Sequence, residues 1–446
     1  MPFQLQSEVL RAATARAVEM RRDFHRYPEL AWTEFRTASL VARRLNKLGL
    51  HVELGRDIVD ADARLGVPET RELAACYQAA HEAGADPEFL PMLEGGYTAV
   101  VGTLEGDRPG PVTALRVDMD ALPINEPGDP THIPAARGFA SRRPGVMHAC
   151  GHDVHTSIGL SVAEVLASHR QLLPGSVRFI FQPAEEGGRG AAPMVQAGTV
   201  DEVDNFIAIH IGLGLPPGSL RPAVDGFLAS VKLDVHFSGR AAHAALRPEQ
   251  GRNALLAAAQ AALGLHAIAP HHAGASRVNV GLMRAGSGRN VVADTALLMA
   301  EVRGANDEVQ RYMEARAQEV VRGAALAFGV QVDIQVAGRT TTARCDQELA
   351  DPVAAAAATV LGLDVERTPV DMGVSEDATY FMRRVQDRGG KATYVVIGTT
   401  LAGGHHTPRF DIDEADMPPA IEALALGVLL AANRTAYERV GEGEGC

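Results

Sequence analysis

The chain has 446 residues, of which 46% are hydrophobic and 22% are charged, a balance typical of a soluble enzyme with two or three domains. Its formal net charge of −13 at pH 7 argues against nucleic acid as a partner. An acidic substrate would therefore need local cationic groups or metal ions in order to bind.

Segment 55–95 contains Pro68, Pro87 and Pro91 together with several glycines. These residues interrupt regular structure, so we expect one or two short helices at the periphery of the fold. A peripheral segment of this kind would shape the access of a substrate.

Segment 147–155 places one thiol, three imidazoles and a carboxylate around Gly151, a density that indicates a metal site. Cys150 and His152 are one residue apart, so their side chains point to the same side of an extended or turning segment. The alternative is a loop that happens to be rich in histidine. The two residues count as ligands only where further ligands converge from elsewhere in the fold.

Further candidate ligands follow apolar runs. The run 179–182 is rich in β-forming residues and leads to two adjacent carboxylates, Glu185 and Glu186. Adjacent acids are costly unless a cation neutralises them; beside a metal, one can ligate while the other carries protons. His210 stands near the end of the run 205–211, where a lone histidine is more often a hydrogen-bonded core residue.

Near the C-terminus, the strand-like run 392–398 precedes a loop that carries His405 and His406. Loops at strand ends are where open α/β sheets build their sites. Five ligands could thus converge around two metal ions, with Glu185 left as a base, an arrangement suited to amide hydrolysis. These ligands are Cys150, His152, Glu186, His210 and one of His405 and His406.

Between His210 and these C-terminal histidines, the pattern predicts a βαββαβ unit of the ferredoxin-like type. The expected elements are strand 231–237, helix 253–268, strands 277–281 and 296–303, helix 307–328 and strand 330–334. Because candidate ligands lie on both sides of this unit, we expect residues 227–338 to form an inserted α+β domain. Residues 1–226 and 339–446 should pack into one catalytic α/β domain with a central mixed sheet of the phosphorylase/hydrolase-like type.

Several motifs resemble those of the M20 metallopeptidase and amidohydrolase family, which includes aminoacylases, hippurate hydrolases, plant auxin-conjugate hydrolases and glutamate-releasing carboxypeptidases. They follow the family's order through nearly the whole chain, at 22–30, 118–122, 147–153, 182–187, 239–244, 375–377 and 406–408. Other segments resemble the branch of the family that hydrolyses p-aminobenzoyl-glutamate, a folate breakdown product. These are 55–98, 116–120, 253–260, 265–271 and 286–290.

The resemblance implies two divalent metal ions in each protomer, with Glu185 as the general base. The implied ligands are Cys150, His152, Glu186, His210 and His406. His406 is favoured over His405 because the family's ligand immediately precedes Ser/Thr-Pro or its equivalent. Asp120 matches the residue that orients the metal site. Resemblance slightly favours manganese, whereas the thiolate and imidazoles would suit zinc.

In this family the inserted domain mediates dimerisation and covers the active site, so the resemblance implies a homodimer. It also implies that His243 reaches the site of the second protomer, where it stabilises the tetrahedral oxyanion together with Asn290. Without the motif around it, His243 would be interpreted as a turn histidine. Arg289 and Arg303 are candidates for binding a substrate carboxylate, although both could equally be surface ion-pair residues.

The expected reaction is metal-dependent hydrolysis of p-aminobenzoyl-glutamate to p-aminobenzoate and glutamate. Two alternatives stay open: a general N-acyl-amino-acid amidohydrolase of the aminoacylase or hippurate hydrolase type, and a subunit that is inactive without a B-type partner. The four cysteines are scattered, which favours a cytoplasmic location. We expect no targeting segment and no apolar run long enough to cross a bilayer.

Overall fold

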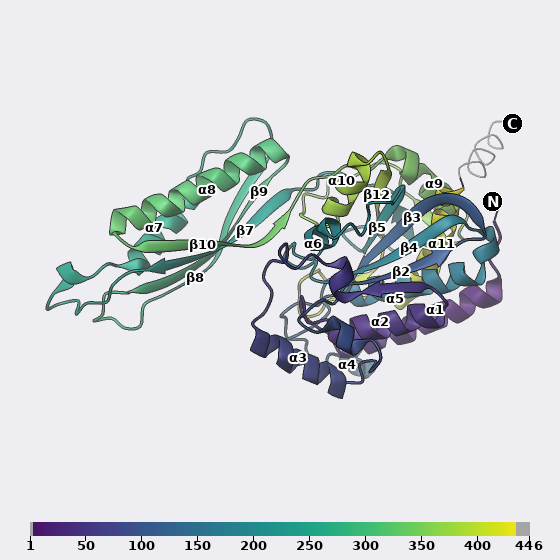
Figure 1. Ribbon diagram of the computed structural model, residues 1–446, viewed down its shortest axis with the longest axis horizontal. Helices are drawn as coiled ribbons and strands as arrows, with labels where there is room; N and C mark the ends of the chain where they lie inside the picture. Colours follow the sequence, from purple (N-terminus) through teal and green to yellow (C-terminus); the bar gives the residue numbers. More distant parts are fainter. Residues whose placement is uncertain (1–2, 434–446) are drawn as a thin grey trace.

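The computed structural model describes residues 3–433. The chain forms two bodies, a larger one built on an eight-stranded sheet and a smaller one built on a four-stranded sheet (Figure 1). Two strands of the smaller sheet, β7 (Ala229–Ser238) and β10 (Gln331–Thr340), lead back to the larger body. The larger body therefore combines chain segments from before and after the smaller one.

The eight-stranded sheet is mixed. Parallel pairing joins β3 (Arg108–Asp118) to β4 (Pro174–Gln182) and β5 (Asn205–Ile211), and joins β5 to β12 (Lys391–Ile397). Every residue of β5 is buried, as expected for a parallel strand covered on both faces. The α/β class and the strands predicted in these regions are confirmed. The outer strands are β1 (His51–Leu54) and β2 (Val100–Glu105) at one edge, and β6 (Ser219–Arg221) and β11 (Asp364–Val365) at the other.

Helices cover both faces of this sheet and enclose two separate apolar cores. The larger core holds side chains of α1 (Ser7–Arg26), α2 (Phe35–Lys47), α5 (His152–Ser168), α9 (Gln347–Ala357) and α11 (Met417–Ala432). The smaller core holds those of α6 (Ala191–Gln196) and α10 (Thr379–Asp387). The sheet is thus held rigidly from both sides, which fixes the positions of its strand ends.

The C-terminal helical segment corrects one expectation from the sequence. Residues 414–432 form a stretch of 19 residues with mean hydropathy 1.4, long and apolar enough to cross a membrane by length and composition. However, 72% of its most apolar window is buried inside the protein, where α11 packs against α9, α5 and α1. We interpret this segment as a core helix, because an all-round apolar helix is typical of a buried one.

The smaller body has the strand order β10-β7-β9-β8, with β8 (Ser276–Ala285) and β9 (Thr295–Gly304) completing the sheet. Its helices are α7 (Ala254–His266) and α8 (Asp307–Phe328), so the predicted βαββαβ order is confirmed. The Asn306 side chain caps α8 by accepting a hydrogen bond from the Val309 N–H at 2.9 Å. The last strand was predicted too short: β10 continues to Thr340, two residues past the expected domain boundary.

Segment 55–95 lies at the periphery, as predicted. It contains one regular helix, α3 (Thr70–Glu82), of which only Leu73 and Ala80 are buried. Two short 3-10 turns, η1 (Gly55–Ile58) and η2 (Leu90–Leu93), lie on either side of it. The remaining short elements of the larger body are α4 (Ile133–Ala136), η3 (Arg170–Leu172), β13 (Leu401–Gly403), β14 (Asp411–Ile412) and η5 (Glu414–Asp416). The smaller body adds η4 (Pro248–Gln250).

Replacing the buried Arg21 with Met is expected to lower the free energy of unfolding by about 3–5 kcal/mol. The change removes one counter-ion from Asp153 and Glu414 and leaves the buried Asp411 without an ion-pair partner among the described residues. Arg21 is fully buried and pairs with Asp153 at 3.0 Å, with Asp411, and with Glu414 at 3.2 Å. Urea unfolding followed by circular dichroism measures this loss. The neighbouring Arg22→Met is the control: its side chain is 35% exposed and its ion pair is with Glu414, so the loss should stay below about 1 kcal/mol. Equal losses for both variants would contradict this account.

Candidate functional site

The candidate site lies where the carboxyl ends of the central parallel strands meet. Asp118 ends β3, Glu185 and Glu186 follow β4, and His210 stands at the next-to-last position of β5. Cys150 precedes the start of α5, in which His152 is the first residue. Such strand ends are where open α/β sheets place their ligands.

Gly151 allows Cys150 and His152 to approach β5. Its φ is 92°, a left-handed conformation that other residues rarely adopt. A Cβ atom at this position would also lie 2.7 Å from Ile211 Cδ1. The turn before α5 therefore requires glycine, and it brings the thiol and the imidazole to the end of the strand.

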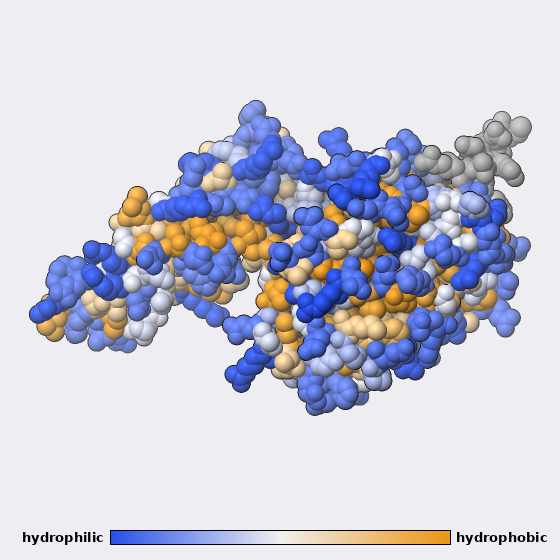
Figure 2. Space-filling view, in the orientation of Figure 1, coloured by the Kyte–Doolittle hydropathy of each residue, from blue (hydrophilic) through white to orange (hydrophobic). Residues whose placement is uncertain are grey.

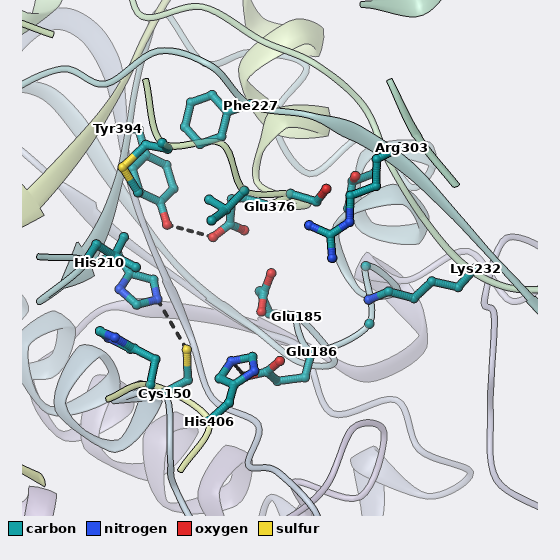
Figure 3. A pocket seen from close by; sticks show the side chains of 18 residues that line it. Cys150, Glu185, Glu186, His210, Phe227, Lys232, Arg303, Glu376, Tyr394 and His406 are labelled. Carbon is teal, nitrogen blue, oxygen red and sulfur yellow. Dashed lines mark hydrogen bonds and ion pairs between the residues drawn. The ribbon is translucent and has the colours of Figure 1, made fainter. Parts of the chain in front are cut away.

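Two groups of donor atoms share the Cys150 thiol. In the first group, Cys150, His152 and His210 place their donors within 4.8 Å of one another, and Cys150 Sγ lies 3.5 Å from His210 Nε2. In the second, Cys150, Glu186 and His406 do the same, with His406 Nε2 3.4 Å from Glu186 Oε1. Figure 3 shows Cys150, Glu186, His210 and His406 around one pocket. The geometry thus offers two adjacent positions for metal ions, with the Cys150 sulfur common to both.

The hydrogen bonds of the buried histidines decide which rings are available as ligands. His210 donates its Nδ1–H to the Ile211 carbonyl at 2.7 Å, which leaves the Nε2 lone pair directed toward Cys150. His155 lies nearby, but both of its nitrogens are engaged: Nδ1 with Asp118 at 2.6 Å and Nε2 with the Ile211 N–H at 3.0 Å. His155 therefore supports the site without a free donor for a metal.

The two C-terminal histidines also differ. His405 Nε2 lies 3.2 Å from the Ile211 carbonyl, and its ring packs against His210 and Phe410. His406 adopts a φ of 59° and turns its ring toward Cys150 and Glu186. Its backbone N–H donates to the Ala149 carbonyl at 2.8 Å, which ties this loop to the Cys150 segment. The ligand geometry therefore favours His406 over His405.

Asp120 connects the acidic pair to His152. Its two carboxylate oxygens accept the backbone N–H groups of Glu185 at 3.0 Å and Glu186 at 2.9 Å. The same carboxylate lies 3.3 Å from His152 Nδ1, on the opposite side of the ring from Nε2. Asp120 therefore positions both the acidic loop and an imidazole that faces the metal positions.

The buried polar atoms of the site fit metal ions. Among the described residues, His152 Nε2 and Glu186 Oε1 are buried and have no hydrogen-bond partner. Unpartnered buried atoms of this kind are costly, and a cation would satisfy both. One thiol, three imidazoles and one carboxylate form a donor set suited to divalent transition metals.

Charge within the site is unevenly distributed. Burial raises the pKa of Glu185 well above its usual range, and the carboxylates of Glu376 and Glu186 raise it further. Burial also acts on Glu186, but the nearby imidazoles of His406 and His152 and the ammonium of Lys232 outweigh it and lower the pKa of this carboxyl. The two neighbouring acids therefore differ: the pKa of Glu186 is lowered, whereas that of Glu185 is raised. That difference suits one ligand and one proton carrier.

A cavity of about 370 Å³ opens beside these donors. Its apolar wall is formed by Leu213, Phe227, Met372, Val374 and the ring of Tyr394. Lys232 and Arg303 enter from the other side and come from the smaller sheet (Figure 3). The arrangement suits a ligand with an aromatic group at one end and negative charge at the other.

Three of the predicted site residues lie away from the cavity of their own chain. His243, Arg289 and Asn290 are exposed in loops of the smaller body. His243 Nδ1 accepts hydrogen bonds from the N–H groups of Ala245 at 3.2 Å and Leu246 at 3.1 Å. β7 runs six residues from Lys232 to its end, so the loop with His243 begins about 20 Å beyond Lys232.

Interpretation of the sequence missed several residues of the site. The Arg116 guanidinium is buried between Asp118 at 2.9 Å and Glu376 at 3.1 Å, and the Tyr394 hydroxyl donates to Glu376 at 2.7 Å. Glu376 belongs to the motif 375–377, to which the sequence alone assigns no role. Lys232 was also missed, because it stands at a polar position of the alternation in β7, where a charged side chain is ordinary.

The model of the peptidase family M20/M25/M40 matches residues 114–429, and this chain belongs to that family. It is a metal-dependent amide or peptide hydrolase with the α/β fold of dinuclear metal-binding peptidases.

Among curated proteins, the chain is 51% identical over 427 residues to the indole-3-acetyl-aspartic acid hydrolase of Enterobacter agglomerans, covering 95% of this chain and 98% of that one. It is also 51% identical over 407 residues to one subunit of the p-aminobenzoyl-glutamate hydrolase of Escherichia coli, covering 91% and 93%.

Two solved structures are similar. The aminobenzoyl-glutamate utilization protein from Klebsiella pneumoniae has a TM-score of 0.81 at 46% identity, covering 96% of this chain and 98% of that one. The Bacillus subtilis YXEP protein, described as a dinuclear metal-binding peptidase, has a TM-score of 0.66 at 25% identity, covering 95% and 99%.

Proposed function

We propose that this chain hydrolyses the amide bond between an aromatic acyl group and an acidic amino acid, with p-aminobenzoyl-glutamate as substrate. The observation that carries the proposal is that two donor groups share the thiol of Cys150, with Glu185 beside them. The adjoining cavity has aromatic side chains on one side and the cations Lys232 and Arg303 on the other. The similarity to the p-aminobenzoyl-glutamate hydrolase of Escherichia coli supports the substrate. The products would be p-aminobenzoate and glutamate.

The proposed metal ligands are Cys150, His152, Glu186, His210 and His406, with manganese preferred and zinc as the alternative. These residues would hold two divalent ions, which would supply Lewis-acid polarisation of the amide carbonyl and a more acidic water molecule. Glu185 accepts the proton from the attacking water and delivers it to the leaving amine. Asp120 fixes the positions of Glu185, Glu186 and His152 for this proton transfer. Arg303, which lines the cavity, contributes to binding the substrate carboxylate.

A second substrate is supported by an equally similar relative, the indole-3-acetyl-aspartic acid hydrolase. Both substrates join an aromatic acyl group to an acidic amino acid. A panel of p-aminobenzoyl-glutamate, indoleacetyl-aspartate and N-acetyl-methionine separates the alternatives. Cleavage of either aromatic conjugate at more than about ten times the kcat/KM of the acetyl substrate supports the proposal. A preference for the acetyl substrate would indicate a general aminoacylase instead.

We propose further that the working unit is a homodimer in which the smaller body completes the site of a second copy. His243, Asn290 and Arg289 are exposed and distant from their own cavity, as this arrangement requires. Figure 2 shows hydrophobic surface on the smaller body, where large exposed side chains include Leu256, Leu263 and Leu326. A B-type subunit is a further candidate partner, since the name of one relative describes it as a single component of a hydrolase. The free thiols of Cys76, Cys150 and Cys345 fit a cytoplasmic location.

Mixing two inactive variants tests the dimer. His243→Ala and Glu185→Gln should each lose most activity, but co-refolded mixtures should regain about one quarter of wild-type activity. The reason is that half of the dimers are mixed, and each mixed dimer has one site with both residues intact. Activity assays at fixed total protein measure this. A mixture no more active than its components, with exchange of protomers shown by differently tagged chains, would contradict the shared site.

A further inference from the structure

The strand register of the smaller sheet places Lys232 in the cavity. In β7 the odd-numbered side chains Val231, Leu233 and Val235 are buried in the core beneath α7 and α8, so the even-numbered ones lie on the opposite face. Lys232 pairs with Glu301 of β9, and Ser230 pairs with Arg303. Lys232, Glu301 and Arg303 therefore share one face, near the end of the sheet that meets the larger body.

The two cations on this face differ in their pairing. Arg303 donates from Nε and Nη2 to the Glu301 carboxylate at 3.1 and 2.9 Å, so its charge is compensated within the strand. Lys232 has no carboxylate within 4.0 Å and no hydrogen-bond partner among residues 3–433. Figure 3 shows its side chain extending into the pocket on the side of Glu185 and Glu186. Lys232 is thus an unpaired cation at the site, among the residues that the structure describes.

Lys232 also lies at the junction of two cavities. A second cavity of about 570 Å³ adjoins the first and is lined in part by Gly66, Pro68, Glu72 and Cys76 of segment 55–95. The residues common to both cavities are Glu186, Gly187, Lys232, Arg303 and His406. A substrate with its amide at the acidic pair can therefore place its acyl ring against the aromatic wall and its amino-acid part beside Lys232.

We infer that Lys232 binds the side-chain carboxylate of the amino-acid part of the substrate, and so selects aspartyl and glutamyl conjugates over neutral ones. This inference rests on the proposed function. Arg303 is already paired, so a second negative charge on the substrate needs another cation. A lysine ammonium hydrogen-bonded to a carboxylate supplies it.

The test compares p-aminobenzoyl-glutamate with p-aminobenzoyl-glutamine, which has the same shape and lacks the side-chain charge. Wild-type protein should favour the glutamate substrate by about 10- to 100-fold in kcat/KM, the range of a charge-assisted hydrogen bond. Lys232→Met should remove most of this preference, mainly through a higher KM for the glutamate substrate, while Lys232→Arg should retain part of it.

Lys47→Met, on an exposed surface, is the matched control and should keep the full preference. A Lys232→Met protein that keeps the wild-type preference would overturn the inference, and Lys232→Gln serves if Lys232→Met does not fold.

A binding measurement separates this inference from the proposed reaction. Calorimetry on the metal-loaded Glu185→Gln protein, with and without Lys232→Met, measures affinity for both ligands without turnover. A preference for the glutamate ligand that depends on Lys232 supports the inference even if wild-type protein hydrolyses neither compound, which would count against the proposed function alone. Equal affinities for the two ligands in the Lys232-containing protein would overturn the inference.

Discussion

Glu185→Gln is expected to lower kcat by about 10²- to 10⁴-fold while both metal ions stay bound. Glutamine has nearly the same shape but cannot accept a proton from water. Glu185 belongs to neither of the two donor groups that share Cys150, although its carboxylate lies within 4.8 Å of donors from His152 and Glu186. Its amide analogue leaves every proposed ligand side chain in place. Steady-state kinetics with the metal-reconstituted variant, together with its metal content by mass spectrometry, measures both parts of this prediction.

Two further variants make the result specific. Glu94→Gln changes an exposed glutamate of segment 55–95 and should leave kcat unchanged. Glu186→Gln should lose metal as well as activity, because Glu186 Oε1 faces His406 and His152 at 3.4 and 4.0 Å. Near-wild-type turnover by the Glu185→Gln protein would show that Glu185 is not the general base.

Cys150→Ala is expected to reduce bound metal below two ions per chain and to lower kcat/KM by more than about 100-fold, since the loss of a direct ligand should exceed that of an outer-shell partner. The thiol is the one donor common to both groups of ligands, so its removal weakens both metal positions together. Equilibrium dialysis with Mn²⁺ and with Zn²⁺ measures the stoichiometry, and kinetics measures the activity.

Cys76→Ser is the control for the loss of a thiol. Cys76 is half-buried and free, its Sγ lies 4.0 Å from Arg143, and it belongs to neither donor group. The Cys76→Ser protein should bind two ions and turn over substrate at the wild-type rate. A Cys150→Ala protein that still binds two ions with unchanged affinity would show that the thiolate does not bridge them.

Much of the candidate site followed from local sequence pattern. Glu185, Glu186 and His210 stand at the ends of apolar runs, and parallel strands bring such ends together at one edge of a sheet. The density of donor residues around Gly151 indicated the metal site, and the structure shows that Gly151 makes the turn into α5. The βαββαβ order of the smaller body was equally readable, because its helices and strands have clear apolar periodicity and α8 begins at the capping residue Asn306.

Other features depend on contacts between distant segments, which a single sequence does not reveal. The role of Arg116 arises only once β3 lies beside the loop with Glu376. The burial of α11 is a property of the helices packed around it, whereas its composition alone resembles a membrane span. Lys232 became a candidate only when the register of β7 against β9 placed it on the face of Arg303.

The most direct test of the account is activity as a function of bound metal. Metal-stripped protein, purified as this chain alone, is titrated with Mn²⁺ and separately with Zn²⁺ while release of p-aminobenzoate from p-aminobenzoyl-glutamate is followed. A dinuclear site made of Cys150, His152, Glu186, His210 and His406 predicts that activity rises until two ions are bound per chain and then levels off. Full activity at one ion per chain, or none with two ions bound, would contradict it.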